Sequence, residues 1–336
     1  MTALTPLPLH PPIYLYGWGH ALPARVVSNA DLVAQGMDTS DEWITERTGI
    51  RQRYILGPAE SVVGLAQQAA QNALTAAQAN ASVVDLVVLA TSTPELSFPA
   101  TATLVQAALG VQRGAAYDVQ AACSGFIYAL ASAADQLRLG RATTAVVIGV
   151  DAFSAFIDWQ DRSTAVLFGD GAGAVVLSTR PPGPGVPYDV VLGYDTQSDG
   201  QYATALQATG GVGRTQTAGS IVMNGREGFK HAVRTMASHV TQTLSTCGVP
   251  LADVALVVPH QANERILAGV AAQLSLPEAQ VLSTVAQHGN TSAASIPLAV
   301  STAVPVLQAG QNWVLTAFGA GFTWGTVVLR RQAPIA

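Results

Sequence analysis

Two halves of this chain repeat the same order of sequence features, and this repetition constrains the fold more than any other property. An apolar, strand-like run begins at Asp85 (DLVVLA), and a similar run begins 168 residues later at Asp253 (DVALVV). Each half then closes on a related glycine-rich stretch, FGDGAGAVVL from Phe168 and FGAGFTWGTVVL from Phe318. Two matches in the same order indicate an internal duplication, with two α/β layers back to back.

Short β-rich runs alternate with alanine-rich helical stretches along both halves. The expected strands are 85–90, 115–119, 144–150 and 253–258. The expected helices are 61–79, 124–139, 230–247 and 295–307. Strands separated by helices of about 10–15 residues indicate βαβ units, and therefore an α/β fold with parallel strands and helices on both faces of the sheet.

Two irregular stretches interrupt this order. The Gly/Pro-rich stretch 181–187 reads as a loop between the halves, so we expect an N-terminal half 1–180 and a C-terminal half 181–336. The stretch 199–219 is rich in Gly, Thr and Gln, and we expect a surface loop near a binding site there.

Composition narrows the class of protein. Hydrophobic residues make up 49% of the chain and charged residues only 11%, whereas soluble proteins average about 25% charged. This balance predicts a large core and buried surface between subunits. The apolar runs 145–150 and 254–258 are far shorter than the roughly 20 residues of a membrane-spanning helix. The N-terminus, MTALTPLPLHPPIY, lacks the basic start of a secretory signal, so we expect a cytoplasmic protein without membrane contact.

Charge and cysteine content exclude further classes. The net charge is −5 and no basic run is present, which disfavours a nucleic-acid partner. The two cysteines, Cys123 and Cys247, are too few for a disulfide framework and are expected to be free thiols. Because CxxC and HExxH patterns are both missing from the sequence, no metal site is predicted.

Cys123 is the first candidate for chemistry. It lies in the run Ala-Ala-Cys-Ser-Gly, between a predicted strand and a predicted helix. The partial positive charge at a helix start favours thiolate, so the thiol pKa is expected below its free value of about 8.5. Free N–H groups in such a turn can also hold an oxyanion. The alternative is that Cys123 is a small buried hydrophobic residue.

His260 and Asn290 are the next candidates. His260 (in PHQAN) follows the DVALVV strand, and sites in open α/β sheets form at the carboxyl ends of strands. Asn290 (in HGNTS) lies in a turn before a predicted helix. Cys123 follows Asp85 by 38 residues and Asn290 follows Asp253 by 37, so the duplication would make them equivalent sites that face one another. The alternatives are a turn histidine and a helix-capping asparagine.

Six motifs, in order, resemble the β-ketoacyl-acyl-carrier-protein synthase III family of the thiolase-like superfamily over nearly the whole chain. They are DTSDEWITERTGIRQR (38–53), AACSGF (121–126), DRSTAVLFGDGAGA (161–174), PHQAN (259–263), HGNTSAAS (288–295) and FGAGFTWG (318–325). The resemblance implies a thiolase-like fold, with two duplicated βαβ-type halves in a layered α-β-α-β-α arrangement.

The resemblance also implies an activity. It is the decarboxylative Claisen condensation of an acyl-CoA, such as acetyl-CoA or another short primer, with malonyl-acyl-carrier-protein, which initiates fatty acid biosynthesis. Cys123 would carry the acyl group as a thioester, and the backbone N–H groups of Cys123 and Ala320 would hold the oxyanion. His260 and Asn290 would donate hydrogen bonds to the malonyl thioester carbonyl as CO₂ leaves. No cofactor is implied, because the coenzyme A thioester enters as substrate.

Further residues match family positions in three groups. The coenzyme A group is Trp43, Arg47, Arg162 and Asn263. The acyl-pocket group is Phe98 and Phe229, with Phe98 reaching across a homodimer interface. The carrier-protein docking group is Lys230, Arg234 and Arg265. Ordinary core packing or solvated charge is the alternative for these side chains.

The chain departs from the family at some positions, and rival activities stay open. Ala271, Ala272 and Gln273 stand where relatives often carry lysines, the N-terminus is roughly ten residues longer than usual, and Ala320 replaces a frequent glycine. A thiolase would need a second catalytic cysteine in FGAGFTW, and elongating condensing enzymes carry histidine in place of Asn290. A pathway-specific homologue making a polyketide, signal or long-chain ketone remains, as do a cysteine thioester hydrolase and a non-catalytic binding protein.

Overall fold

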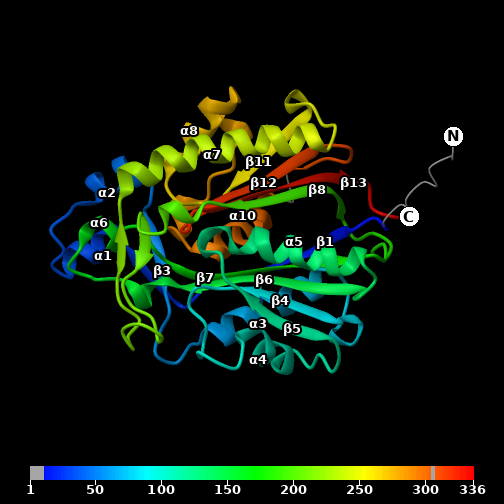
Figure 1. The fold of residues 1–336 in the computed structure, drawn as a ribbon, viewed down its shortest axis with the longest axis horizontal. Helices are drawn as coiled ribbons and strands as arrows, with labels where there is room; N and C mark the ends of the chain where they lie inside the picture. The colour runs from blue at the N-terminus through cyan, green and yellow to red at the C-terminus, as the bar shows by residue number, and fades with distance from the viewer. Residues whose placement is uncertain (1–10, 304–306) are drawn as a thin grey trace.

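The main sheet is a single hydrogen-bonded series of strands that bends at its middle into two stacked halves (Figure 1). The strands of one half follow the reverse order of those in the other. The structure, a computed structural model, describes residues 11–303 and 307–336, so most of the N-terminal extension lies outside the described residues. The strand order is β11-β12-β13-β8-β1-β7-β6-β4-β5. From the first half come β1 (Tyr14–Ala21), β4 (Leu86–Ala90), β5 (Ala115–Val119), β6 (Thr144–Ala152) and β7 (Asp170–Ser178). From the second come β8 (Tyr188–Ser198), β11 (Val254–Pro259), β12 (Asn312–Gly319) and β13 (Thr323–Gln332).

The strands pair in both directions, so the expected parallel pairing holds for only part of the sheet. The pairs β4–β5, β4–β6 and β11–β12 are parallel. The pairs β6–β7 and β12–β13 are antiparallel, because the glycine-rich stretch of each half turns back on the preceding strand. β1 and β8 meet over a short register, Tyr14 to Tyr16 against Tyr188 to Val190, so the two halves form two stacked sheets rather than one flat one.

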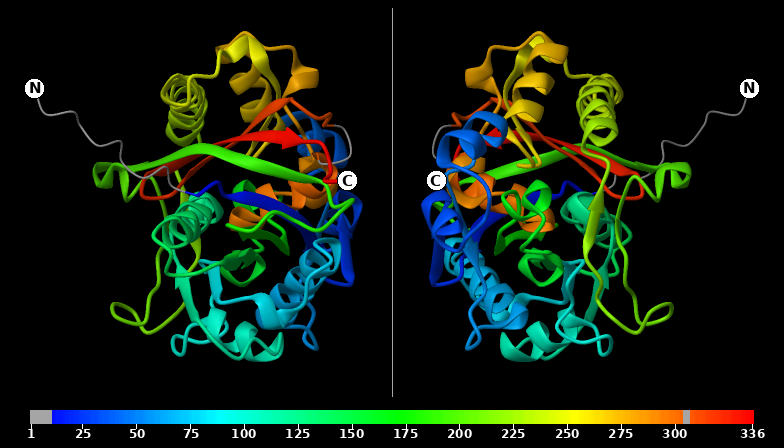
Figure 2. Two further views of the ribbon diagram at one scale, coloured as in Figure 1. Left: turned by 90° about the vertical axis from the view of Figure 1, so that its right-hand side faces the viewer. Right: turned by 90° about the vertical axis from the view of Figure 1, so that its left-hand side faces the viewer.

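Helices fill the space between the two sheets and cover both outer faces (Figures 1 and 2). The middle layer holds α5 (Gly125–Arg138) and α10 (Ser295–Ala303). The outer layers are α3 (Val62–Ala76) with α4 (Thr101–Ala108) and α7 (Gly225–Thr246) with α8 (Glu264–Leu274). The layered α-β-α-β-α arrangement is therefore confirmed. No helix within the described ranges is long and apolar enough to cross a membrane.

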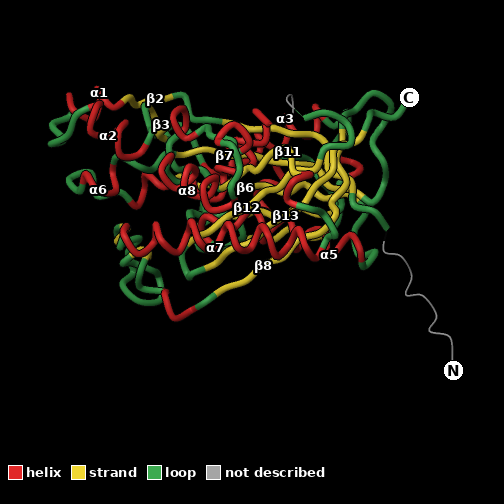
Figure 3. The backbone as a smooth tube through the Cα atoms, turned by 90° about the horizontal axis from the view of Figure 1, so that it is seen from above, coloured by secondary structure: helices red, strands yellow, loops and turns green. Residues whose placement is uncertain are grey.

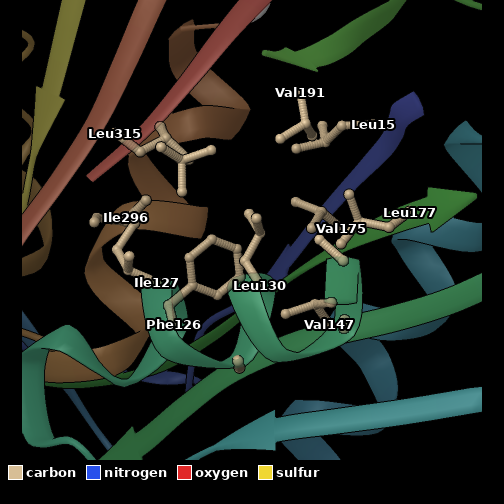
Figure 4. Close-up of a cluster of buried hydrophobic side chains, with 14 of the residues drawn as sticks. Leu15, Phe126, Ile127, Leu130, Val147, Val175, Leu177, Val191, Ile296 and Leu315 are labelled. Atoms are coloured by element: carbon tan, nitrogen blue, oxygen red, sulfur yellow. The ribbon is translucent and has the colours of Figure 1, made fainter. Parts of the chain in front are cut away.

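The core of the middle layer explains why α5 is apolar around most of its circumference. Phe126, Ile127 and Leu130 of this helix are fully buried, and they contact strands of both sheets (Figure 4). On the facing strands, Val147 belongs to β6 and Leu315 to β12. Burying such side chains is worth roughly 1.5–3 kcal/mol each. This shared core fixes the two halves against each other, and with them the ends of their strands.

Short elements gather at one end of the molecule, where the strands end (Figure 3). The stretch between β1 and α3 forms β2 (Arg25–Ser28), α1 (Asn29–Ala34), α2 (Asp41–Thr48) and β3 (Gln52–Ile55). The other short elements are α6 (Arg162–Ala165), β9 (Leu206–Ala208), β10 (Ile221–Met223) and α9 (Val285–His288).

Candidate functional site

Two matching turns meet at the centre of the molecule, and Cys123 lies in one of them. The 3₁₀ turn Ala122–Ser124 precedes α5, and the 3₁₀ turn Ser292–Ala294 precedes α10. Ala122 and Ser292 both adopt left-handed backbone angles, with φ of 45° and 49°. The duplicate of Cys123 is therefore Ala293. The expectation that Asn290 is the equivalent of Cys123 was wrong, because the loops that lead to the two turns differ in length.

A cavity of about 550 Å³ brings the predicted catalytic groups together. Cys123, His260, Asn290 and Ala320 all line it. Its wall is largely apolar and includes Phe153, Phe156, Phe168, Leu206, Ile221 and Met223. The irregular stretch 199–219 contributes to this wall from Ala205 to Gly210, which agrees with its expected place near a binding site.

His260 follows the last residue of β11 and is held as a neutral imidazole. Its backbone N–H donates to the carbonyl of Thr316 at 2.8 Å. Its ring Nδ1 lies 2.6 Å from the hydroxyl of Ser295. Burial lowers the pKa of His260 to about 3, because the interior disfavours the imidazolium. The ring is therefore a neutral donor or acceptor at ordinary pH.

Asn290 is oriented by its own turn. Its Oδ1 accepts the backbone N–H of Ser292 at 3.0 Å, so the amide Nδ2 is the group left for the cavity. The backbone is fixed as well, since the Asn290 N–H donates to the carbonyl of Leu167 and the Asn290 carbonyl accepts the N–H of Gly169. The site thus offers an amide donor from a rigid turn.

Cys123 is more deeply buried than its position before a helix suggested. It is only 6% exposed. Burial raises the pKa of the thiol to about 12, and the nearby Asp151 carboxylate adds to the increase. The expectation of a pKa below the free value is thus contradicted, because the helix start lies under β12 and not in solvent. The Cys123 side chain is therefore a neutral thiol at ordinary pH.

This raised pKa predicts how Cys123 reacts with alkylating agents. In a Cys247→Ser background, the rate of alkylation by iodoacetamide should rise about tenfold per pH unit from about pH 6 to pH 9, because only the thiolate reacts. Intact-protein mass spectrometry follows the reaction, and Cys123→Ala gives the background. A rate that levels off below pH 9 would contradict the raised pKa.

A glycine lets the second half approach the Cys123 turn closely. β12 ends at Gly319, where a Cβ atom would lie 2.8 Å from the backbone N of Cys123 and 3.0 Å from that of Ser124. The Thr323 hydroxyl donates to the carbonyl of Ala121 at 2.9 Å, and the Ser124 hydroxyl donates to the carbonyl of Thr323 at 2.9 Å. These contacts hold the backbone around Ala320 beside the thiol.

The duplicated turn shows what the N–H at this position can bind. The backbone N–H of Ala293, the duplicate of Cys123, donates to the Asp151 carboxylate at 3.0 Å. Asp151 also accepts the backbone N–H of Ser92 at 2.7 Å. Within residues 11–303 and 307–336, the N–H of Cys123 donates to no backbone carbonyl. This N–H is therefore available to an anion in the cavity.

Known proteins are similar in sequence to most of this chain. The sequence model described as 3-oxoacyl-[acyl-carrier-protein (ACP)] synthase III matches residues 117–200, and the one described as its C terminal matches residues 244–331. A β-ketoacyl-[acyl-carrier-protein] synthase III from Rhodospirillum centenum is 51% identical over 318 residues, which are 94% of this chain and 98% of that protein. The chain belongs to the β-ketoacyl-[acyl-carrier-protein] synthase III family.

Solved structures of the synthase III family share the fold. The crystal structure of 3-oxoacyl-(acyl carrier protein) synthase III from Pseudomonas aeruginosa PAO1 is 44% identical, with a TM-score of 0.88 over 97% of this chain and 100% of that one. The enzyme of the same name from Aquifex aeolicus VF5 is 43% identical, with a TM-score of 0.87 over 95% and 99% of the two chains. The thiolase-like fold expected from the motifs is thereby confirmed.

The residues that match the coenzyme A group of the synthase III family lie together beside the cavity. The guanidinium of Arg47 lies 4.6 Å from the centre of the Trp43 ring, and that of Arg162 lies 5.0 Å from it. Asn263 lines the cavity and links it to this cluster, since its Nδ2 donates to the Arg47 carbonyl at 3.2 Å. Its Oδ1 accepts the N–H of Arg265 and so caps α8.

The residues that match carrier-protein docking positions lie on one outer layer. Lys230 and Arg234 are exposed and one turn apart on α7, and Arg265 is exposed in the first turn of α8. The two helices lie side by side above the upper sheet (Figure 1). Phe229, next to Lys230, lines the cavity and is 39% exposed. Basic groups thus stand near the cavity wall formed by Phe229.

Sequence reasoning missed several residues that shape the site. Ser295 contacts the His260 ring, and Asp151 accepts the N–H of Ala293 in the duplicated turn. Gly319 and Thr323 lie against the turn that holds Cys123. Ser295, Gly319 and Thr323 lie inside motifs quoted for the resemblance, which is the one signal that marked them. Asp151 lies outside all six motifs, so only the fold reveals it.

Proposed function

We propose that this protein condenses an acyl-CoA with malonyl-acyl-carrier-protein to give a β-ketoacyl-acyl-carrier-protein, CO₂ and free coenzyme A, and so initiates fatty acid synthesis. The observation that carries the proposal is the convergence of one thiol and two neutral polar groups, His260 and Asn290, in one largely apolar cavity. The half-identical relatives named β-ketoacyl-[acyl-carrier-protein] synthase III support the same reaction.

The first step is acyl transfer. The Cys123 sulfur attacks the thioester carbonyl of the acyl-CoA, and the carbonyl oxygen becomes an oxyanion. The N–H groups of Cys123 and Ala320 stabilise this charge. The C–S bond to coenzyme A then breaks, and the departing thiolate takes up the proton that the Cys123 thiol loses. The product is an acyl thioester on Cys123.

The second step is decarboxylative condensation. Hydrogen bonds from Asn290 Nδ2 and from the His260 ring stabilise the malonyl thioester oxygen as negative charge develops on it. The C–C bond to the carboxylate breaks, CO₂ leaves, and the electron pair forms an enolate. Its carbon attacks the acyl carbonyl, the C–S bond to Cys123 breaks, and the thiolate that leaves takes up one proton from solvent. Neutral donors suit this step, because an imidazolium would have to be desolvated in the buried site.

Surface groups support the identity of the two substrates. Trp43 with Arg162 offers flat surfaces to an adenine ring, and Arg47 offers charge to the coenzyme A phosphates. Lys230, Arg234 and Arg265 form the docking site for the acidic carrier protein. The reaction needs no metal or redox cofactor, since loss of CO₂ drives it.

We also propose a cytoplasmic homodimer. Phe98 is 84% exposed and Leu96 is 49% exposed, although both are large and apolar. Burying them between subunits removes apolar surface from water, and Phe98 would reach the acyl pocket of the partner subunit. Light scattering of the purified protein checks this proposal, and a fully active monomer would contradict it.

The decisive experiment is intact-protein mass spectrometry of the wild type and of Cys123→Ala. Each is incubated with acetyl-CoA, and malonyl-acyl-carrier-protein is then added. The wild type should gain one acetyl group that malonyl-acyl-carrier-protein discharges as the acetoacetyl product, whereas Cys123→Ala should gain none. An adduct formed only with longer or branched acyl-CoA would favour a pathway-specific homologue, and an adduct cleared by water alone would indicate a hydrolase.

A further inference from the structure

The contact between His260 and Ser295 indicates which nitrogen of the imidazole carries the proton. Both side chains are 2% exposed, and His260 Nδ1 lies 2.6 Å from the Ser295 oxygen. The Ser295 oxygen also accepts the backbone N–H of Gln261 at 3.3 Å. Ser295 is the first residue of α10, so the rigid middle layer fixes its position.

The direction of this hydrogen bond follows from counting donors and acceptors. A serine hydroxyl has one proton to donate. Among the residues that the structure describes, His260 Nδ1 is the one acceptor in hydrogen-bond geometry with the Ser295 hydroxyl, while the Gln261 N–H already donates to that oxygen. The hydroxyl proton therefore goes to Nδ1. A neutral imidazole that accepts at Nδ1 carries its own proton on Nε2.

We propose that Ser295 is a positioning residue that holds His260 in the tautomer protonated at Nε2, so that the ring enters the reaction as a hydrogen-bond donor. This inference rests on the proposed function and deepens it. A donor at Nε2 stabilises the oxygen of the malonyl thioester. It cannot accept the Cys123 proton through the same nitrogen, so the two steps depend on Ser295 to different degrees.

Loss of the hydroxyl is expected to separate the two steps. In Ser295→Ala, Nδ1 has no donor, and the ring is free to place its proton on either nitrogen. Decarboxylation of malonyl-acyl-carrier-protein should slow by about 10- to 100-fold, the loss seen when the partner that orients a metal-bound histidine is removed. Acylation of Cys123 by acetyl-CoA should stay within about threefold of the wild type, because the oxyanion N–H groups are unchanged.

A matched control and a conservative variant accompany this change. Ser301→Ala removes a hydroxyl from the same helix that donates to the Pro297 carbonyl and does not contact His260, so it should leave both rates unchanged. Ser295→Thr keeps a hydroxyl and should recover part of the decarboxylation rate. Equal losses of both rates in Ser295→Ala, or no loss of either, would overturn the proposal.

A spectroscopic measurement tests the tautomer without any turnover. In protein labelled with ¹⁵N-histidine, the His260 signals are identified by their loss in His260→Gln. The wild type should show a protonated Nε2 and an unprotonated Nδ1, and Ser295→Ala should shift both toward a mixture of tautomers. A wild type protonated at Nδ1 would refute the role of Ser295 even if the condensation occurs. A wild type protonated at Nε2 that does not condense would refute only the proposed function.

Discussion

Replacing Asn290 by Asp should slow decarboxylation of malonyl-acyl-carrier-protein by about 100- to 1000-fold and leave acylation of Cys123 within a few-fold of the wild type. Aspartate has the same shape as asparagine. In the wild type, the backbone N of Ser292 lies 3.0 Å from Asn290 Oδ1, and in the variant one carboxylate oxygen should accept the same N–H. The other oxygen replaces the Nδ2 donor and opposes the negative charge of the enolate. Release of CO₂ and the mass of the acyl adduct measure the two steps separately.

Asn80 provides a control with the same local geometry. Its Oδ1 accepts the backbone N–H of Ser82 at 3.0 Å, but it lies at the surface. Asn80→Asp should therefore change neither step. If Asn290→Asp decarboxylates at the wild-type rate, Asn290 is not a donor to the malonyl oxygen. If the variant loses both decarboxylation and acylation, the substitution has disturbed the cavity as a whole.

Gly319→Ala should reduce the rate of Cys123 acylation by about 100- to 1000-fold, the usual cost of losing an oxyanion donor. The new Cβ would lie 2.8 Å from the backbone N of Cys123 and 3.0 Å from that of Ser124, closer than van der Waals contact allows. Because both neighbours are backbone atoms, β12 must move away from the turn. The N–H groups of Cys123 and Ala320 can then no longer donate to the same oxygen. Stopped-flow mass spectrometry with acetyl-CoA measures the rate.

The control for this change is Gly183→Ala, where a Cβ would meet no atom within 4 Å. It should acylate as the wild type does. Thermal unfolding of both variants separates a local displacement from loss of the fold. A Gly319→Ala protein that acylates normally would show that the close approach of β12 does not matter for oxyanion binding.

Local signals made the elements of the two halves predictable. The helix expected at 124–139 is Gly125–Arg138, and it ends before Gly140, which has a φ of 69°. The strand expected at 253–258 is Val254–Pro259. The helix expected from residue 230 begins five residues earlier, because the Asn224 side chain caps it by accepting the N–H of Glu227. A polar cap outside the apolar periodicity is easily overlooked in a sequence.

The site was predictable in its residues but not in its electrostatics. Cys123, His260 and Asn290 each follow a recognisable strand or turn, and the cavity includes all three. The pKa of Cys123 depends on how much water is displaced by β12, which is remote in sequence, so the local helix start predicted the wrong direction. The contact of Ser295 with His260 was equally unpredictable from local sequence, because the two residues are 35 positions apart.

The carboxylate of Asp151 makes the two duplicated turns different in what their backbone N–H groups can bind. Both turns present a backbone N–H to the interior, but at Ala293 that position is filled by a charge belonging to the protein itself. No substrate oxyanion can compete with a carboxylate that is covalently part of the scaffold and held by Ser92 as well. Asp151 therefore occupies the anion-binding position of one turn, and only the turn that holds Cys123 keeps its N–H for a substrate.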